Sequence, residues 1–298
     1  MCKDSCKFIK QVERNQSMNQ VKLRLLLEQF FLEDIGEQDV TTDLIFPGDT
    51  TGEMAFIAKE AGVFCGVDVL KTGFPLLDSE VTVKLLVKDG EKVERGQKIA
   101  EMSGKVSSLL TGERVILNLV QRMSGVATLT RRAVETLNNA HTRICDTRKT
   151  TPGLRMLEKY AVRVGGGYNH RYGLYDGVMI KDNHIAFAGS ITKAVLRVRE
   201  SAGHMVKIEV ETETKAQVLE AVEAGADVIM FDNCTPEEME ALNPLVPAHI
   251  VTEASGGILL ENLADYQQSK VDYISLGFLT HSYRALDISA KVIIEGEK

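Results

Sequence analysis

Hydrophobic and polar positions alternate with recognisable periods over the first hundred residues. Residues 21–35 repeat hydrophobic side chains at helical spacing, which predicts an amphipathic helix that ends at Gly36. Alternation of hydrophobic and polar residues predicts strands over residues 51–59 and 80–87, with a short helix over residues 66–77 between them. These elements indicate an α+β domain.

A longer helical pattern follows and marks a change in organisation. It runs from Thr111 to about Asn139, and Ser124 and Gly125 predict an interruption within it. The polar residues 39–43 predict a loop, in which the aspartates would serve turn chemistry. A domain boundary is expected near residues 104–112.

Strand-like and helix-like segments then alternate to the end of the chain, which is typical of a parallel α/β sheet or barrel. A complete barrel of this kind has eight strands. The apolar runs predict only six, so the barrel is expected to be incomplete or open. These runs end at Cys145, Ile180, Val210, Phe231, Thr252 and Leu276. The predicted organisation is a flexible extension over residues 1–19, an α+β domain over 20–111 with segments that pack on the C-terminus, and an α/β barrel catalytic domain over 112–298.

Composition limits the classes of protein that the chain can belong to. The hydrophobic share of 44% and charged share of 26% are those of a globular protein, and no apolar run is long enough for a transmembrane helix. The polar N-terminus lacks the apolar core of a secretory signal, so a cytoplasmic location is expected. The five cysteines are expected to be reduced, and Cys2 and Cys6 have no neighbouring pair with which to complete a metal site.

One stretch of the chain has a charge opposite in sign to that of the whole protein. Residues 146–184 hold seven lysines and arginines against four acidic residues, a local charge of +3 in a chain of net charge −7. A basic island in an acidic protein predicts a small ligand with several negative groups. The acidic pI near 5.5 argues against nucleic-acid binding.

The residues that directly follow each predicted strand form a coherent set. Basic residues follow the early strands, carboxylates the middle ones and glycine-containing loops the last ones. The carboxyl ends of barrel strands carry the active site, and the last loops often bind phosphate. Each residue alone is better explained as a salt bridge, a cap or a structural histidine, and Arg122 alone as a solvated helix residue. Together they predict one site, made of Arg148, Lys149, Lys181, Glu211, Asp232, residues 255–257 and Gly277.

Three blocks give the chain its resemblance to a known family. They are TRKT at residues 147–150, GGGYNHR at 165–171 and KDNH at 181–184. With weaker blocks from residue 34 to 282, the chain resembles the quinolinate phosphoribosyltransferases over nearly its whole length after about residue 20. Phe278 departs from the alanine usual in that family. A ModD-like protein of the same fold, linked to molybdenum transport, and a non-catalytic anion-binding regulator are the alternatives.

The resemblance implies a type II phosphoribosyltransferase-like fold, an N-terminal α+β sandwich domain followed by an open α/β barrel. It implies that the enzyme joins quinolinate to phosphoribosyl pyrophosphate (PRPP), with loss of pyrophosphate and CO₂, as part of NAD biosynthesis. It implies Mg²⁺ as cofactor, placed near Glu211 and Asp232 mainly through PRPP and water. It also implies a homodimer or larger homo-oligomer in which Arg122 reaches the neighbouring active site.

The resemblance further assigns roles residue by residue. The implied catalytic residues are Lys149, Lys181, Glu211 and Asp232. The implied substrate-binding residues are Arg122, Thr147, Arg148, Lys149, His170, Arg171, Lys181, Glu211, Asp232, Ser255, Gly256, Gly257, Ser275, Leu276 and Gly277.

Overall fold

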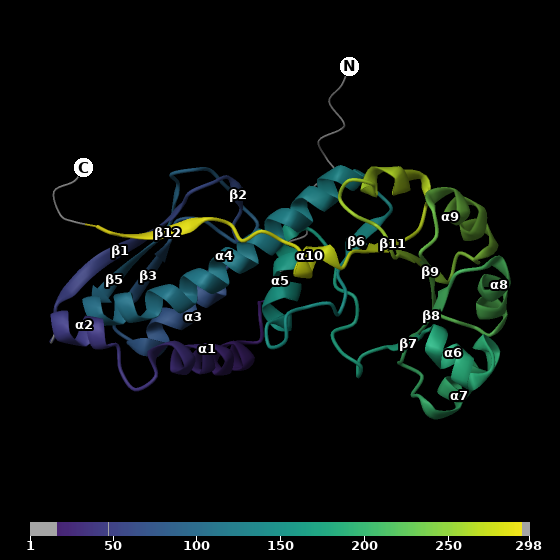
Figure 1. Ribbon diagram of the computed structural model, residues 1–298, viewed down its shortest axis with the longest axis horizontal. Coiled ribbons are helices and arrows are strands. Elements are labelled where there is room, and N and C mark those ends of the chain that lie inside the picture. The colour runs from purple at the N-terminus through teal and green to yellow at the C-terminus, as the bar shows by residue number, and fades with distance from the viewer. Residues whose placement is uncertain (1–16, 47, 294–298) are drawn as a thin grey trace, which may run out of the picture.

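The computed structural model describes residues 17–46 and 48–293 (Figure 1). An N-terminal lobe of sheet and helices lies at one end, and a C-terminal lobe of parallel strands wrapped by helices lies at the other. The extension predicted over residues 1–19, with Cys2 and Cys6, falls almost wholly outside the described residues. None of the helices in the described part of the chain is long and apolar enough to cross a membrane.

Two helices open the N-terminal lobe. Helix α1 (Gln20–Ile35) is capped by the Asn19 side chain, buries Leu23, Leu27 and Phe31 one turn apart, and ends at Gly36 as predicted. The loop predicted over residues 39–43 is wrong, because these residues enter a second helix, α2 (Val40–Ile45). The Asp39 carboxylate accepts the backbone N–H of Thr42 at 3.0 Å, so this residue caps a helix instead of shaping a turn.

The predicted strands of this lobe pair in one antiparallel sheet. Its order is β12–β1–β5–β3, made of Ile288–Val292, Thr51–Ala58, Lys98–Lys105 and Thr82–Leu85. The C-terminal strand β12 thus returns to the N-terminal lobe, where it pairs with β1. Helix α3 (Val67–Leu77) packs between α1 and α4, and strands β2 (Gly62–Val63) and β4 (Lys92–Val93) form a small separate ribbon.

Helix α4 (Val106–Leu137) runs through the expected boundary and joins the two lobes (Figure 1). The predicted interruption at Ser124 and Gly125 is wrong, since both residues are helical. The Ser124 hydroxyl accepts the backbone N–H of Cys65 at 3.0 Å. A Cβ atom on Gly125 would lie 2.3 Å from the carbonyl oxygen of Arg284. These small residues therefore serve close packing against neighbouring segments, a need that outweighs their low helix propensity.

The C-terminal lobe confirms the open barrel. Six parallel strands follow the order β6–β11–β10–β9–β8–β7, and β6 and β7 do not pair, so the barrel is open between them. Tyr168 forms an isolated bridge with Cys145 at this opening. The strands are β6 (Arg143–Cys145), β7 (Val178–Ile180), β8 (Ile208–Thr212), β9 (Val228–Asp232), β10 (Val251–Ser255) and β11 (Tyr273–Ser275).

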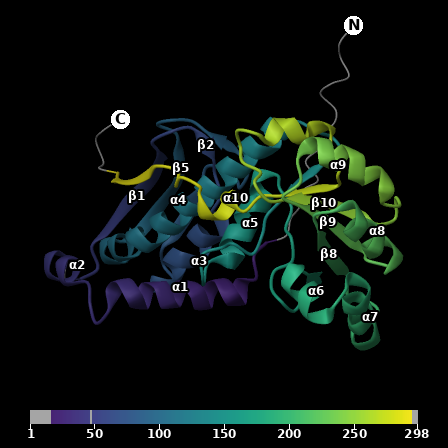
Figure 2. The ribbon, with the colours of Figure 1, turned by 45° about the vertical axis from the view of Figure 1, so that its right-hand side comes forward.

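Helices α7 (Ile191–Ser201), α8 (Lys215–Glu223) and α9 (Pro236–Leu242) lie on the outside of the strands (Figure 2). Helices α5 (Arg155–Gly165) and α10 (Phe278–His281) contact α4, and α6 (Asp182–Ala188) packs on α7. Short 3₁₀ turns lie at Asn243–Leu245 and Leu263–Gln268. Cys65, Cys145 and Cys234 are buried free thiols, in agreement with the reduced state expected from the sequence.

Candidate active site

One cavity of about 710 Å³ opens at the carboxyl ends of the barrel strands. It brings together most of the residues that were predicted from separate strand ends. The predicted residues that line it are Thr147, Arg148, Lys149, His170, Arg171, Lys181, Glu211, Asp232, Ser255, Gly256, Gly257, Ser275 and Gly277. Phe278, the departure from the family pattern, also lines the wall.

Leu276 and Arg122 do not line this cavity. The Leu276 side chain is buried, and its backbone N–H donates to the carbonyl oxygen of Cys145 at 2.9 Å. Arg122 donates to the Glu158 carboxylate and the Thr151 hydroxyl, and its guanidinium lies 4.9 Å from the centre of the Tyr283 ring. Its predicted reach into a neighbouring subunit stays a prediction.

The rim of the cavity pairs cations with carboxylates. Lys181, at the end of β7, forms an ion pair with Glu211 on the adjacent strand β8. Burial raises the pKa of both Glu211 and Asp232, although Lys181 opposes the shift in each case. Lys149 approaches from the loop after β6, where a Cβ atom on Gly277 would lie 3.0 Å from its Cδ. A side chain at this position would press on the lysine and require it to shift by a few tenths of an ångström.

The opposite wall is basic and unpaired. Arg148 and Arg171 form no ion pair within the described residues, and the buried Nε atom of Arg148 has no hydrogen-bond partner there. Burial and the nearby charge of Arg148 lower the pKa of Arg171. Two guanidinium groups that face a cavity without an acidic partner form a receptor for an anion, and their planar forks suit carboxylates.

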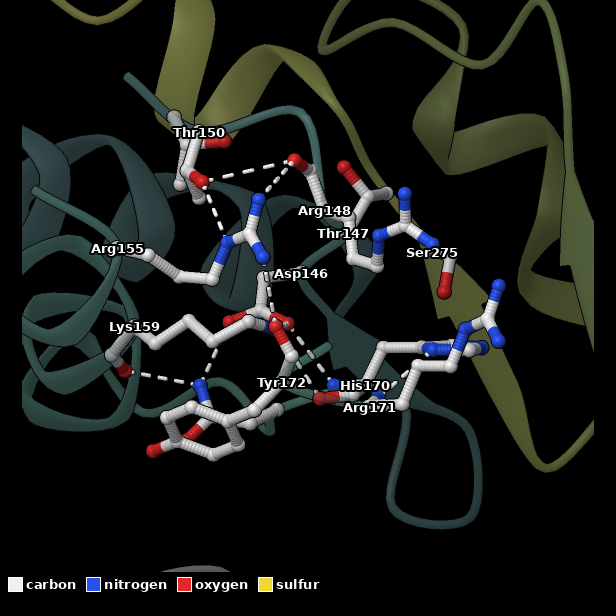
Figure 3. A network of polar contacts seen from close by, with 12 residues as sticks. Asp146, Thr147, Arg148, Thr150, Arg155, Lys159, His170, Arg171, Tyr172 and Ser275 are labelled. Atoms are coloured by element: carbon white, nitrogen blue, oxygen red, sulfur yellow. Dashed lines mark hydrogen bonds and ion pairs between the residues drawn. The ribbon is translucent and has the colours of Figure 1, made fainter. Parts of the chain in front are cut away.

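A buried network behind this wall holds it in place (Figure 3). Asp146 and Lys159 are both fully buried and form an ion pair at 2.5 Å. Asp146 also accepts the backbone N–H of His170 at 2.8 Å, and Lys159 donates to the carbonyl oxygen of His170 at 3.0 Å. The pair therefore holds the His170 backbone from both sides. Arg155 similarly donates to the carbonyl oxygens of Arg148 and Tyr172 at 3.3 and 2.9 Å.

Sequence reasoning missed the floor of the site. His170 Nε2 lies 2.9 Å from Glu209 Oε2 and 3.5 Å from Glu253 Oε1, and the Ser275 hydroxyl donates to Glu253. Burial alone would lower the pKa of His170, but its hydrogen bond to Glu209 and the charge of Glu253 raise it overall. Burial, with the nearby charge of Glu209, raises the pKa of Glu253 to about 8. Both carboxylates come from inward-facing positions within strands, whereas the prediction examined only strand ends.

The last loops of the barrel have a backbone suited to phosphate. Gly256 and Gly257 have φ values of 85° and 64°, and Asn233 on the neighbouring loop has 54°. A Cβ atom on Gly256 would lie 2.2 Å from the Asn233 side-chain oxygen, so this close approach requires glycine. Asn233 and His281 also line the cavity. Asn233 directly follows Asp232 in the predicted set of strand-end residues, whereas His281 had no predicted role.

Comparisons with known proteins agree with this architecture. The family model for the N-terminal domain of quinolinate phosphoribosyl transferase matches residues 39–124, and the model for the C-terminal domain matches residues 126–291. A probable nicotinate-nucleotide pyrophosphorylase (carboxylating) from Bacillus subtilis is 58% identical over 280 residues, which cover 94% of this chain and 96% of that protein. Quinolinate phosphoribosyltransferase (decarboxylating) 1b from Nicotiana tabacum is 40% identical over 292 residues, which cover 92% of this chain and 83% of that protein.

A solved structure gives the same result. NadC from Streptococcus pyogenes superimposes with a TM-score of 0.89 at 41% identity, over 93% of this chain and 99% of that one. The two family models match this chain in the order N-terminal domain, then C-terminal domain. The chain belongs to the quinolinate phosphoribosyltransferase family.

Proposed function

We propose that quinolinate binds against Arg148, His170 and Arg171, and that PRPP binds along the rim from Lys149 to Ser255. The enzyme joins the ring nitrogen of quinolinate to C1′ of PRPP, releases pyrophosphate and CO₂, and yields nicotinate mononucleotide in NAD biosynthesis. The names of the matched relatives decide against the ModD-like protein and the anion-binding regulator.

The unpaired basic wall is the observation that carries the placement of quinolinate. The substrate is a dianion with carboxylates on adjacent ring carbons. Arg148 and Arg171 present two guanidinium groups with no acidic partner among the described residues, and His170 lines the cavity beside them. Thr147 adds a hydroxyl from the same loop as Arg148. A monoanion such as nicotinate would leave one of these cations without a partner in a partly buried site.

The acidic rim fits the other substrate. Loss of pyrophosphate develops positive charge at C1′, and carboxylates at Glu211 and Asp232 stabilise that charge. Lys149 and Lys181 lie on the same rim, where they hold the negative oxygens of the leaving pyrophosphate. Glycine loops at Gly256, Gly257 and Gly277 approach the 5′-phosphate, with Ser255, Ser275 and Leu276 beside them. The cavity holds both substrates side by side, which makes proximity a large part of the rate enhancement.

The rim also suits the expected cofactor. Glu211 and Asp232 offer hard carboxylate oxygens from adjacent strands to a common cavity. Mg²⁺ prefers such oxygens, and it keeps several waters of its own. Both carboxylates would hold the hydrated ion through its waters, with PRPP as its direct ligand. When bound, Mg²⁺ neutralises charge on the pyrophosphate.

We further propose that the enzyme is a homodimer or a larger homo-oligomer. We also place the enzyme in the cytoplasm. Helices α1 and α2 expose a set of large apolar side chains, and the open side of the barrel exposes Leu174, Tyr175 and Phe187 at 76%, 82% and 92%. Patches of this kind mark interaction sites, and a closed homodimer would cover them. The residues exposed on α1 and α2 are Val21, Leu25, Leu32, Val40, Leu44 and Ile45.

Product analysis tests the proposed function. The purified enzyme is supplied with PRPP, Mg²⁺ and one of quinolinate, nicotinate or nicotinamide, and a parallel reaction contains excess EDTA. We expect nicotinate mononucleotide and CO₂ from quinolinate alone, and no turnover with EDTA. Equal use of nicotinate would refute the assignment of Arg148 and Arg171 to a dianion, and full activity in EDTA would remove Mg²⁺ from the proposal.

A further inference from the structure

The floor of the cavity holds two buried carboxyl groups and a single imidazole. Glu209, Glu253 and His170 each offer one polar atom, and these three atoms lie within 4.8 Å of one another. The side chains of the two glutamates are only 8% and 6% exposed. Lys159, the one fully buried lysine or arginine among the described residues, is already paired with Asp146. One imidazole cannot neutralise two buried carboxylates, so one of the carboxyl groups keeps a proton.

Several contacts assign this proton to Glu253. His170 Nε2 lies closer to Glu209 than to Glu253, at 2.9 against 3.5 Å, so Glu209 is the carboxylate that accepts from the imidazole. The Ser275 hydroxyl donates to Glu253. The groups that face Glu253 from the other packed elements are Cys145 and Asp146, a buried thiol and a carboxylate, and neither supplies positive charge. Glu253 also lines the cavity, whereas Glu209 does not.

The reaction consumes a proton at one defined atom. When CO₂ leaves, the bond between C2 and the carboxylate carbon breaks and its electron pair stays on C2, which must then form a C–H bond. The guanidinium groups of Arg148 and Arg171 hold their protons too tightly to serve as donors. Lys181 is paired with Glu211. His170 has both ring nitrogens engaged within the protein, since Nδ1 accepts the backbone N–H of Arg171 at 2.8 Å and Nε2 faces Glu209 at 2.9 Å. Glu253 lines the cavity and is the carboxyl group that keeps a proton.

We propose that Glu253 is the proton store for decarboxylation and that it gives its proton directly to C2 of the substrate. The O–H bond of the Glu253 carboxyl group breaks as the C–H bond at C2 forms, and water in the cavity restores the proton of Glu253. His170 is not the donor, because its Nδ1 accepts the backbone N–H of Arg171 at 2.8 Å and its one N–H, at Nε2, faces Glu209. No oxidant or other reactant is needed. The inference rests on the proposed seating of quinolinate against Arg148 and Arg171, and it makes Glu253, which lines the cavity, a catalytic residue.

Single-turnover kinetics separate this role from binding. Wild-type enzyme, Glu253→Gln and Asp89→Asn are each mixed in excess with PRPP and quinolinate, and pyrophosphate and nicotinate mononucleotide are measured in the same quenched samples. Asp89 is a matched control, because it is a mostly buried carboxylate outside the cavity, bonded to the Tyr160 hydroxyl at 2.6 Å. Its loss lowers stability without touching the floor of the site.

We expect Glu253→Gln to release pyrophosphate at nearly the wild-type rate but to form nicotinate mononucleotide roughly 100-fold more slowly, the usual contribution of a positioned acid. The carboxylated nucleotide then accumulates. The control should form both products at equal rates. A parallel loss of both products, or no loss of either, would overturn the proposal. No pyrophosphate from the wild-type enzyme would instead refute the proposed function.

Two further measurements keep the test independent of the variant's folding. In the wild-type enzyme, the delay between pyrophosphate and nicotinate mononucleotide should appear above about pH 8, where Glu253 loses its proton. Products that stay simultaneous up to pH 9.5 would contradict the proposal. The alternative is that the floor is a metal site, and metal analysis of the purified protein tests it. A zinc ion that is bound in stoichiometric amount and lost in Glu253→Gln would overturn the proposal.

Discussion

The ion pair between Asp146 and Lys159 gives the sharpest prediction about what holds the site together. Both side chains are fully buried, and their charged atoms lie 2.5 Å apart. Substitution of Lys159 by methionine fills a similar volume but leaves the Asp146 carboxylate buried with only the Asn169 amide and the His170 N–H as donors. Breaking a buried pair in this way costs about 3–5 kcal/mol of unfolding free energy.

The expected change is large enough for a simple assay. A protein of this size loses about 2 °C of melting temperature per kcal/mol, so Lys159→Met should melt about 6–10 °C lower at equal protein concentration. The double variant Asp146→Asn with Lys159→Met removes the uncompensated charge and keeps an acceptor for the His170 N–H. It should therefore be more stable than Lys159→Met alone. A single variant within about 0.5 kcal/mol of wild type, or a double variant less stable than the single one, would refute the reasoning.

Three other predictions concern catalysis and pH. Lys149→Ala should reduce turnover at saturating substrates about 100-fold or more and leave the melting temperature unchanged, because this exposed side chain contributes to the rim and not to the core; unchanged turnover would sink the assignment of Lys149. Arg122→Ala should be inactive alone but regain about a quarter of wild-type activity when subunits are exchanged with Lys149→Ala, because half of the dimers then hold one complete site; no rescue would show that Arg122 acts within its own subunit. Burial raises the pKa of Glu253 from 4.5 to about 8, so the folded state binds a proton that the unfolded state releases. The unfolding free energy of the wild-type enzyme should therefore fall between about pH 4.5 and 8 relative to that of Glu253→Gln. Urea titrations at several pH values measure this, and an equal change of unfolding free energy with pH in both proteins would contradict the prediction.

The sequence could predict most of the rim because parallel strands place their carboxyl ends at one edge. Lys181, Glu211 and Asp232 are far apart along the chain, yet each follows an apolar run, and the barrel brings them to one cavity. The apolar run that identifies a strand also identifies its end. The open barrel was predictable for the same reason, since six runs were visible and six strands form.

Local residue preferences were less reliable where packing decides. Ser124 and Gly125 have low helix propensity and predicted a break, but the chain beside Cys65 and Arg284 approaches so closely that only small residues fit. The polar stretch at residues 39–43 looked like a turn because a helix cap and a turn use the same residue types. In both cases, the information that decides the structure lies in a partner segment that is distant in sequence.

The floor of the site shows a second kind of limit. Glu209 and Glu253 stand inside the strands IEVET and VTEAS, where buried Ile208 and Val210 flank the first and buried Thr252 and Ala254 flank the second. A carboxylate within an apolar strand is a signal in itself, because an unpaired buried charge would destabilise the fold by several kcal/mol. What the pattern cannot specify is the partner. His170 comes from a loop at the opening of the barrel. The Asp146–Lys159 pair holds its backbone, and the Arg171 N–H donates to its Nδ1 at 2.8 Å. The proton store at Glu253 therefore depends on tertiary contacts that the strand pattern does not specify. A change at Lys159 should disturb decarboxylation, although this residue lines no part of the cavity.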